Sequence, residues 1–219
     1  HVLKQARPPQ QRRVDIHAHP PFCCRGNVNF FQTCYHKGKE KERGFRMKNK
    51  TFWIAETAVM IALLVALQWA TKALGQFVTG SCVNLVLGVS TLVGGVWCGA
   101  VVALVSPFCA FLVGVGPAKL AIVPFIAVGN LVLVLVLHFI AGGKPLGLRS
   151  YLAVAAAAVC KFVVLFLLVT RVAIPALNLP EAAASAMSAS FSWPQLVTAA
   201  IGGVIAVTIA PAIRKALKR

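Results

Sequence analysis

Residues 77–118 read FVTGSCVNLVLGVSTLVGGVWCGAVVALVSPFCAFLVGVGPA, a run of 42 residues without a formally charged side chain. A single α-helix of that length would be about 63 Å long, twice the roughly 30 Å hydrocarbon core of a bilayer. The run must therefore fold back on itself, and the Gly94-Gly95 pair near its centre is the natural turn. The segment predicts a helical hairpin embedded in a membrane.

The same length test, applied outward from this hairpin, gives six candidate spans. Each has close to the 20 residues that a helix needs to cross a bilayer, and no strand-like alternation competes with the helical interpretation. The spans are 52–74, 77–94, 96–116, 120–141, 151–174 and 195–213. The sequence therefore predicts an all-α, polytopic membrane protein, with a bundle of six transmembrane helices in a domain over residues 47–219.

Residues 1–46 differ sharply from this apolar domain. The whole chain is 58% hydrophobic, yet its net charge is +17, and ten of its 22 basic residues precede Met47, the first methionine. The octapeptide KGKEKERG just before Met47 can be encoded by purine-only codons. A purine-rich stretch just upstream of a start codon is typical of a bacterial ribosome-binding site. We expect residues 1–46 to be a disordered or non-native extension, a translated leader. Its VDIHAHP string resembles the metal-binding start of an amidohydrolase barrel, but the later ligands and strands of such a barrel do not follow. Its cysteines lack the ligand spacing of a zinc site, so no metal is expected.

The basic residues of the domain are distributed unevenly between its two sides. Six spans place both termini on one side, which carries eight basic residues in its loops and ends against three on the other side. This is the positive-inside pattern. It predicts a multi-pass protein of the bacterial cytoplasmic membrane with both termini in the cytoplasm, and it makes a nucleic-acid partner unnecessary.

Polar side chains at membrane depth are costly and mark helix contacts or a substrate path. Lys161 lies near the middle of the fifth span, where it is expected to be an unpaired cation suited to an anionic group such as a carboxylate. The candidate substrate-binding residues are Lys161, Asn84, Asn130, Gln68, Gln76, Lys119, Trp193 and Gln195. Alternatives stay open for several of them: interhelical hydrogen bonds for both asparagines, snorkelling for Lys119 and a place in the aromatic belt for Trp193.

Two stripes of small residues recur at four-residue spacing. Ala58, Ala62 and Ala66 form one on the first span, and Gly202, Ala206 and Ala210 form another on the last. Such stripes let helices approach closely within a bilayer. Each stripe fits either packing inside the bundle or a docking face for another membrane subunit.

Six short spans, the Ala-x-x-x-Ala stripe and cytoplasmic termini resemble the S component of an energy-coupling factor transporter. The strings QFVTGSCVNLVL (76–87), PFIAVGN (124–130) and FSWPQLVTAAIGG (191–203) are similar to members of this family with no assigned substrate. The resemblance implies a membrane-embedded binding subunit for a vitamin or other micronutrient. It also implies an energy-coupling T subunit, docked on Ala58, Ala62 and Ala66, and two cytoplasmic ATPases as partners.

Other function classes are less well supported by the residues. The chain lacks a G-x-x-x-x-G-K-[ST] phosphate loop, paired carboxylates and a nucleophile elbow, so we expect neither an enzyme nor a bound cofactor. An independent secondary transporter, or small permease, is the main alternative. Such a transporter would typically use acidic residues for ion coupling, and Glu56 is the only acid within a predicted span.

Overall fold

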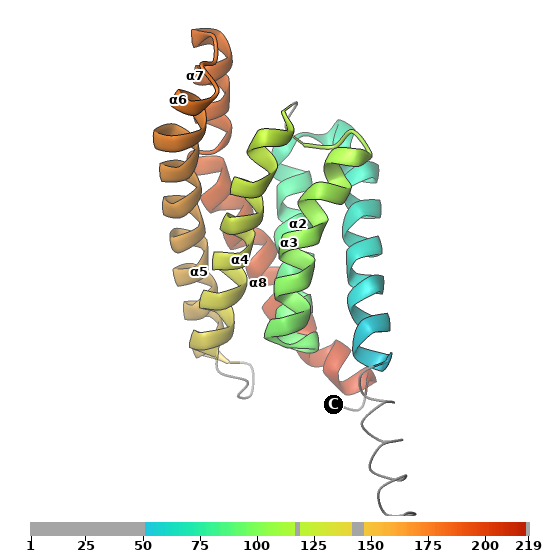
Figure 1. The fold of residues 1–219 in the computed structure, drawn as a ribbon. Coiled ribbons are helices and arrows are strands. Elements are labelled where there is room, and N and C mark those ends of the chain that lie inside the picture. Colours follow the sequence, from blue (N-terminus) through green and yellow to red (C-terminus); the bar gives the residue numbers. More distant parts are fainter. Residues whose placement is uncertain (1–50, 117–118, 142–146, 218–219) are drawn as a thin grey trace, which may run out of the picture. The chain divides into compact units, whose positions relative to one another are not determined.

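The computed structural model describes residues 51–116, 119–141 and 147–217, and the expectations for residues 1–46 lie outside this part. In the described residues every regular element is helical (Figure 1). Within these ranges, five helices are long and apolar enough to cross a membrane, and a sixth apolar helix is shorter. The predicted all-α fold of a multi-pass membrane protein is confirmed.

The five long helices and the shorter sixth one follow the predicted spans closely. The first is the span Thr51–Leu74, which ends in a 3-10 turn at Lys72–Leu74. The next three are α2 (Gln76–Gly94), α3 (Val96–Leu112) and α4 (Val123–Ala141), the last preceded by a 3-10 turn at Leu120–Ile122. The last two are α5 (Leu148–Leu167) and α8 (Trp193–Ala216).

The turn between α2 and α3 is where the sequence predicts it. Gly95 separates the two helices with a φ of 90°, a left-handed conformation that glycine adopts at little cost. The third helix ends four residues earlier than predicted, because Gly114 and Gly116 also have positive φ values and break the helix.

The predicted fifth span, 151–174, contains a change of helix type, and a short helix that the sequence did not predict follows it. After α5 the helix widens into a π-helical segment, Leu168–Ala173, and continues as α6 (Ile174–Ala176). Pro175 cannot donate a hydrogen bond to the preceding turn and its ring crowds that turn, so a wider turn relieves the contact. A further short helix, α7 (Glu181–Ser190), stands at the upper end of the bundle in Figure 1.

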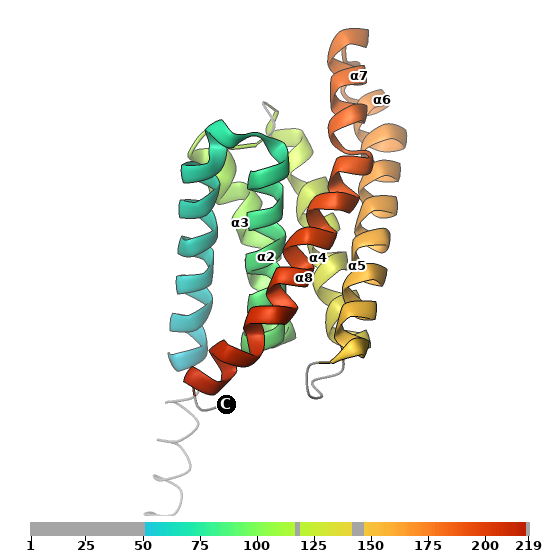
Figure 2. The same ribbon diagram turned by 180° about the vertical axis from the view of Figure 1, so that it is seen from behind.

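Helix α8 crosses the bundle obliquely and packs most extensively on α2, with a second contact on α5 (Figure 2). The close approach depends on the stripe formed by Gly202, Ala206 and Ala210, which is fully buried. The packing interpretation of this second stripe is therefore confirmed.

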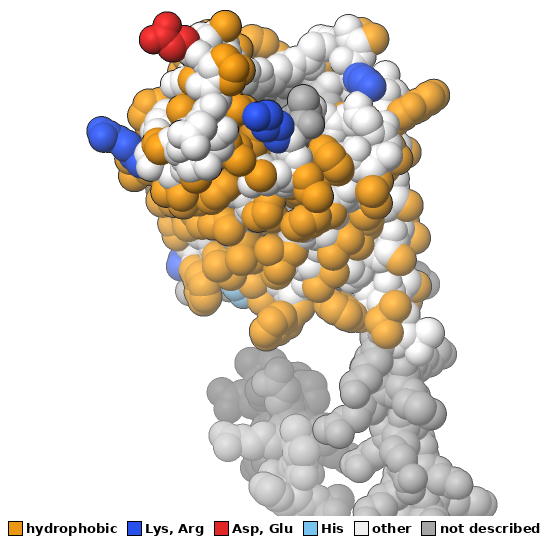
Figure 3. All heavy atoms as spheres, turned by 45° about the horizontal axis from the view of Figure 1, so that its top comes forward, with side chains coloured by type: hydrophobic (Ala, Val, Ile, Leu, Met, Phe, Trp, Pro, Cys, Tyr) orange, Lys and Arg blue, Asp and Glu red, His pale blue; other side chains and the backbone are white. Residues whose placement is uncertain are grey.

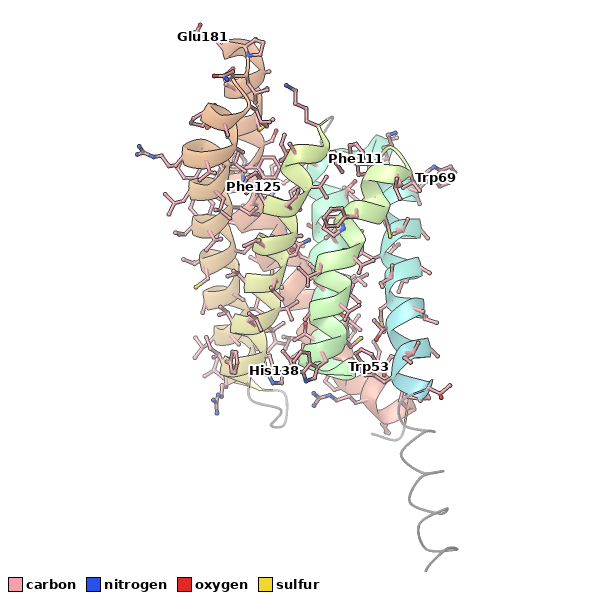
Figure 4. All side chains as sticks on the ribbon, in the orientation of Figure 1. Trp53, Trp69, Phe111, Phe125, His138 and Glu181 are labelled. Carbon is pink, nitrogen blue, oxygen red and sulfur yellow. The ribbon has the colours of Figure 1, made fainter. Side chains whose placement is uncertain are left out.

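The outer surface matches the surroundings expected of a membrane bundle. Hydrophobic side chains cover its flank, whereas charged side chains lie on the upper rim (Figure 3). Trp53 lies near the lower end of the first span and Trp69 near its upper end (Figure 4). Sixteen residues of helix separate them by about 24 Å, the spacing of two aromatic belts.

The lower end of α2 is closed by a cation from α8. Arg214 is half-buried, its Nε donates a hydrogen bond to the Leu92 carbonyl oxygen at 2.9 Å, and its guanidinium NH2 donates to the same oxygen. Carbonyls in the last turn of a helix lack intrahelical donors, and a cation there also faces the negative end of the helix dipole.

Replacing Arg214 with methionine should lower the free energy of unfolding by about 1–2 kcal/mol, because the carbonyl oxygen loses a charged donor. The measurement is thermal or denaturant unfolding of the full chain in detergent. Lys215→Met is the matched control, since Lys215 is exposed on the same helix. Equal stability of the two variants would show that the Arg214 contact does not contribute.

Candidate functional site

A cavity of about 670 Å³ occupies the upper half of the bundle. Its walls come from the upper ends of the first span, α2, α3, α4 and α8, from the middle of α5, and from α7. The residues that line it are Gln68, Lys72, Gly75, Gln76, Thr79, Gly80, Val83, Asn84, Ser106, Pro107, Ala110, Gly114, Val115, Gly116, Ile126, Asn130, Lys161, Ala183, Ala186, Met187, Ser190, Phe191 and Gln195. A volume of this size is typical of small-molecule binding sites.

Lys161 lies on the wall of this cavity at the depth of two asparagines. Its ammonium Nζ donates to Asn84 Oδ1 at 2.6 Å and to Asn130 Oδ1 at 2.7 Å. Lys161 is 3% exposed, and both asparagines are buried as well. The lysine therefore has two hydrogen-bond partners, but both are neutral amide oxygens, so these contacts give the cation no counter-charge.

These contacts join three helices, since Asn84, Asn130 and Lys161 belong to α2, α4 and α5. A fourth helix is attached through Thr198 of α8, whose hydroxyl lies 3.4 Å from Asn84 Nδ2. Asn84 Nδ2 also donates to the Gly80 carbonyl at 2.8 Å. Hydrogen bonds between membrane helices are individually modest, but together these fix the positions of the polar groups at the inner end of the cavity.

Gln76 and Gln195 line the cavity and also contact the end of α7. The side-chain amide of Gln76 donates to the Ser190 carbonyl at 2.5 Å, and that of Gln195 lies 3.4 Å from the same oxygen. Ser190 is the last residue of α7. The two glutamines therefore hold the end of α7 against the cavity, while also lining it.

Two predicted residues do not line the cavity. Lys119 is exposed at the upper end of the bundle. Trp193 is 59% exposed, and its ring centroid lies 5.5 Å from that of Phe77 on the outer surface. The snorkelling and aromatic-belt interpretations describe these positions better.

The structure also brings in residues that the sequence analysis missed. Ser106 of α3 lines the cavity and is 1% exposed, and the depth argument used for Asn84 would have identified it. Ala183, Ala186 and Met187 belong to α7, whose position no sequence signal indicated.

The charges around the cavity have one sign. Lys72 and Lys161 line it, and none of its lining residues is acidic. Of the acids in the described residues, Glu181 lies at the tip of α7 (Figure 4), whereas a carboxylate oxygen of Glu56 lies beside Gly94 at the lower end. The charged side chains that line the cavity are thus both basic, which suits a neutral or negatively charged ligand better than a cation. No protein-family model, curated protein or solved structure matches the chain.

Proposed function

We propose that this protein is the substrate-binding subunit of an energy-coupling factor importer, the S component. Its substrate is a small micronutrient of the vitamin class, bound in the cavity between the membrane helices. The observation that carries the proposal is the cavity itself, which combines a size suitable for such a molecule with a fixed polar end at Asn84, Asn130 and Lys161.

The exposure of the first alanine stripe supports docking on a membrane partner. Ala58, Ala62 and Ala66 are all exposed along the first span, and this span is the least buried of the five long ones. Small side chains on an outward face permit close approach of another helix in the bilayer. On this proposal the partner is the T subunit, and two ATPases in the cytoplasm supply the energy.

The location of the acids favours this function over an independent secondary transporter. Ion-coupled carriers place ionisable acids along the substrate path. Here the described residues put Glu56 and Glu181 away from the cavity lining. Energy from partner subunits therefore fits the site better than a proton or sodium gradient does.

Co-purification tests the proposal. The tagged full chain is expressed with a T subunit and two ATPases of a bacterial energy-coupling factor transporter, and the membrane extract is purified through the tag. We expect a complex of all four subunits, and we expect its uptake of the micronutrient substrate to depend on ATP hydrolysis. A folded chain that purifies alone and transports in proteoliposomes under an ion gradient would overturn the proposal and favour the secondary transporter.

A further inference from the structure

The hydrogen bonds of Lys161 leave one donor unused. An ammonium group has three N–H donors and no acceptor. Two of them bind Asn84 Oδ1 and Asn130 Oδ1, and the described residues provide no acceptor for the third. Since Lys161 lines the cavity, this third N–H is available to a ligand.

Asn130 offers a second donor at the same place. Because an ammonium only donates, both asparagines must turn their oxygens toward Lys161, which directs each amide NH2 elsewhere. Asn84 Nδ2 is satisfied by the Gly80 carbonyl and Thr198. Asn130 Nδ2 has no hydrogen-bond acceptor among the described residues. The inner end of the cavity therefore has two donors without an acceptor there, this amide group and the third N–H of Lys161.

The charge at this end is also uncompensated. Burying an ionised amine is costly unless a counter-charge or several acceptors accompany it. Lys161 has two neutral oxygens as acceptors, and no acidic side chain lines the cavity. A ligand carboxylate would supply both the negative charge and two acceptor oxygens for the unused donors.

The opposite wall of the cavity also has polar atoms without hydrogen-bond partners. Gln68 Oε1 and Ser106 Oγ are buried atoms without a hydrogen-bond partner among the described residues. They lie on the first span and α3, while Lys161 comes from α5, on the other flank of the bundle in Figures 1 and 2. A buried amide oxygen left without a donor costs about 1–3 kcal/mol, so Gln68 Oε1 favours a ligand group that donates a hydrogen bond, while the Ser106 hydroxyl can either donate or accept.

We propose that the cavity binds a carboxylate-bearing molecule lengthwise between these two walls. The carboxylate accepts hydrogen bonds from Lys161 Nζ and Asn130 Nδ2, and a hydroxyl or N–H group at the other end of the ligand donates to Gln68 Oε1, beside the Ser106 hydroxyl. Between them its body contacts apolar lining residues such as Val83, Ile126 and Met187. The inference rests on the proposed binding function and adds to it the ligand's charge, its functional groups and its orientation.

The test uses the full chain in detergent and three fractions of a bacterial metabolite extract, separated by ion exchange into anions, neutral molecules and cations. We expect the anion fraction alone to raise the unfolding temperature, by roughly 5–10 °C when its ligand is in hundredfold excess over Kd. Treating that fraction with alkaline phosphatase should leave the shift intact, because a carboxylate survives and a phosphate monoester does not. Stabilisation by the neutral or cation fraction, loss after phosphatase, or no shift with any fraction would overturn the inference.

Variants locate the ligand's two ends. Lys161→Met should weaken binding of the active fraction at least about tenfold, since a charged hydrogen bond is lost. Ser106→Ala should also weaken it, whereas Arg171→Met removes an exposed upper-end cation outside the cavity lining and should not. Unchanged affinity of a folded Lys161→Met protein would exclude the orientation. Association with the T subunit is measured separately, so failure of the ligand assignment and failure of the proposed function are distinguishable.

Discussion

Replacing Gly202 with valine should prevent the bundle from folding. A Cβ atom at residue 202 would lie 2.4 Å from the Ser81 carbonyl oxygen and 2.7 Å from the Leu85 amide nitrogen. Both are backbone atoms of α2, so no side-chain rotation can make room. Overpacking of this kind costs about 1–3 kcal/mol even where neighbours can shift, and here it acts at the most extensive helix contact. We expect a loss of about 3 kcal/mol or more, a large share of the total stability of a typical domain.

The measurement is the yield of monodisperse full chain in detergent together with its unfolding temperature. Ala212→Val is the matched control, because it adds the same β-branched side chain at an exposed position of the same helix. Gly202→Ala provides a graded step, since alanine raises helix propensity by about 1 kcal/mol and would stabilise the protein if the site had space. A stable Gly202→Val protein with an unchanged cavity would show that α2 and α8 do not pack at this distance.

The substitution also bears on the site, since the new Cβ would lie 2.8 Å from Asn84 Cβ. The asparagine that accepts a hydrogen bond from Lys161 therefore depends on a glycine of α8. Variants that fold with α8 displaced should have weaker ligand binding, even though Gly202 does not line the cavity.

Much of this architecture could be predicted from the sequence because a bilayer limits the alternatives. An uncharged run too long for one helix must turn, and the Gly94-Gly95 pair marks where it does. Asn84, Asn130 and Lys161 are predicted to lie at comparable depth, because polar groups within apolar helices mark helix contacts or a substrate path, and all three line one cavity. The hydrogen bonds of Lys161 to the two asparagines are not predicted, and the role of the three residues toward a ligand stays a prediction.

Other features depend on packing that no local pattern encodes. The two small-residue stripes have the same spacing, yet Gly202 is buried and Ala62 exposed, because only the assembled bundle decides which face of a helix is covered. The polar, alanine-rich sequence of helix α7 fits either a loop or a helix, so its structure could not be predicted from the sequence. Its contact with the cavity depends on Gln76 and Gln195, which belong to α2 and α8.

On the proposed function, replacing Ala62 with leucine should weaken association with the T subunit while leaving the fold intact. Ala62 is exposed in the middle of the stripe, so a larger side chain meets no neighbour within the described bundle but would hold an approaching helix away. An overpacking cost of about 1–3 kcal/mol corresponds to a loss of affinity of roughly tenfold to a hundredfold. The measurement is the fraction of chain recovered in the four-subunit complex, with the unfolding temperature of the isolated chain recorded alongside.

Two further leucine variants separate docking from folding. Ala155→Leu adds the same side chain at an exposed position of α5, and should leave both the complex and the unfolding temperature unchanged. Ala206→Leu places the same side chain in the buried stripe. Gly88 of α2 lies so close that a Cβ atom added to it would be 2.6 Å from Ala206 Cβ, so this variant should destabilise the isolated chain. Recovery of the complex by Ala62→Leu at the level of the Ala155→Leu control would contradict docking on this stripe. The exposed alanines would then face lipid, and the partner would have to bind another surface of the bundle.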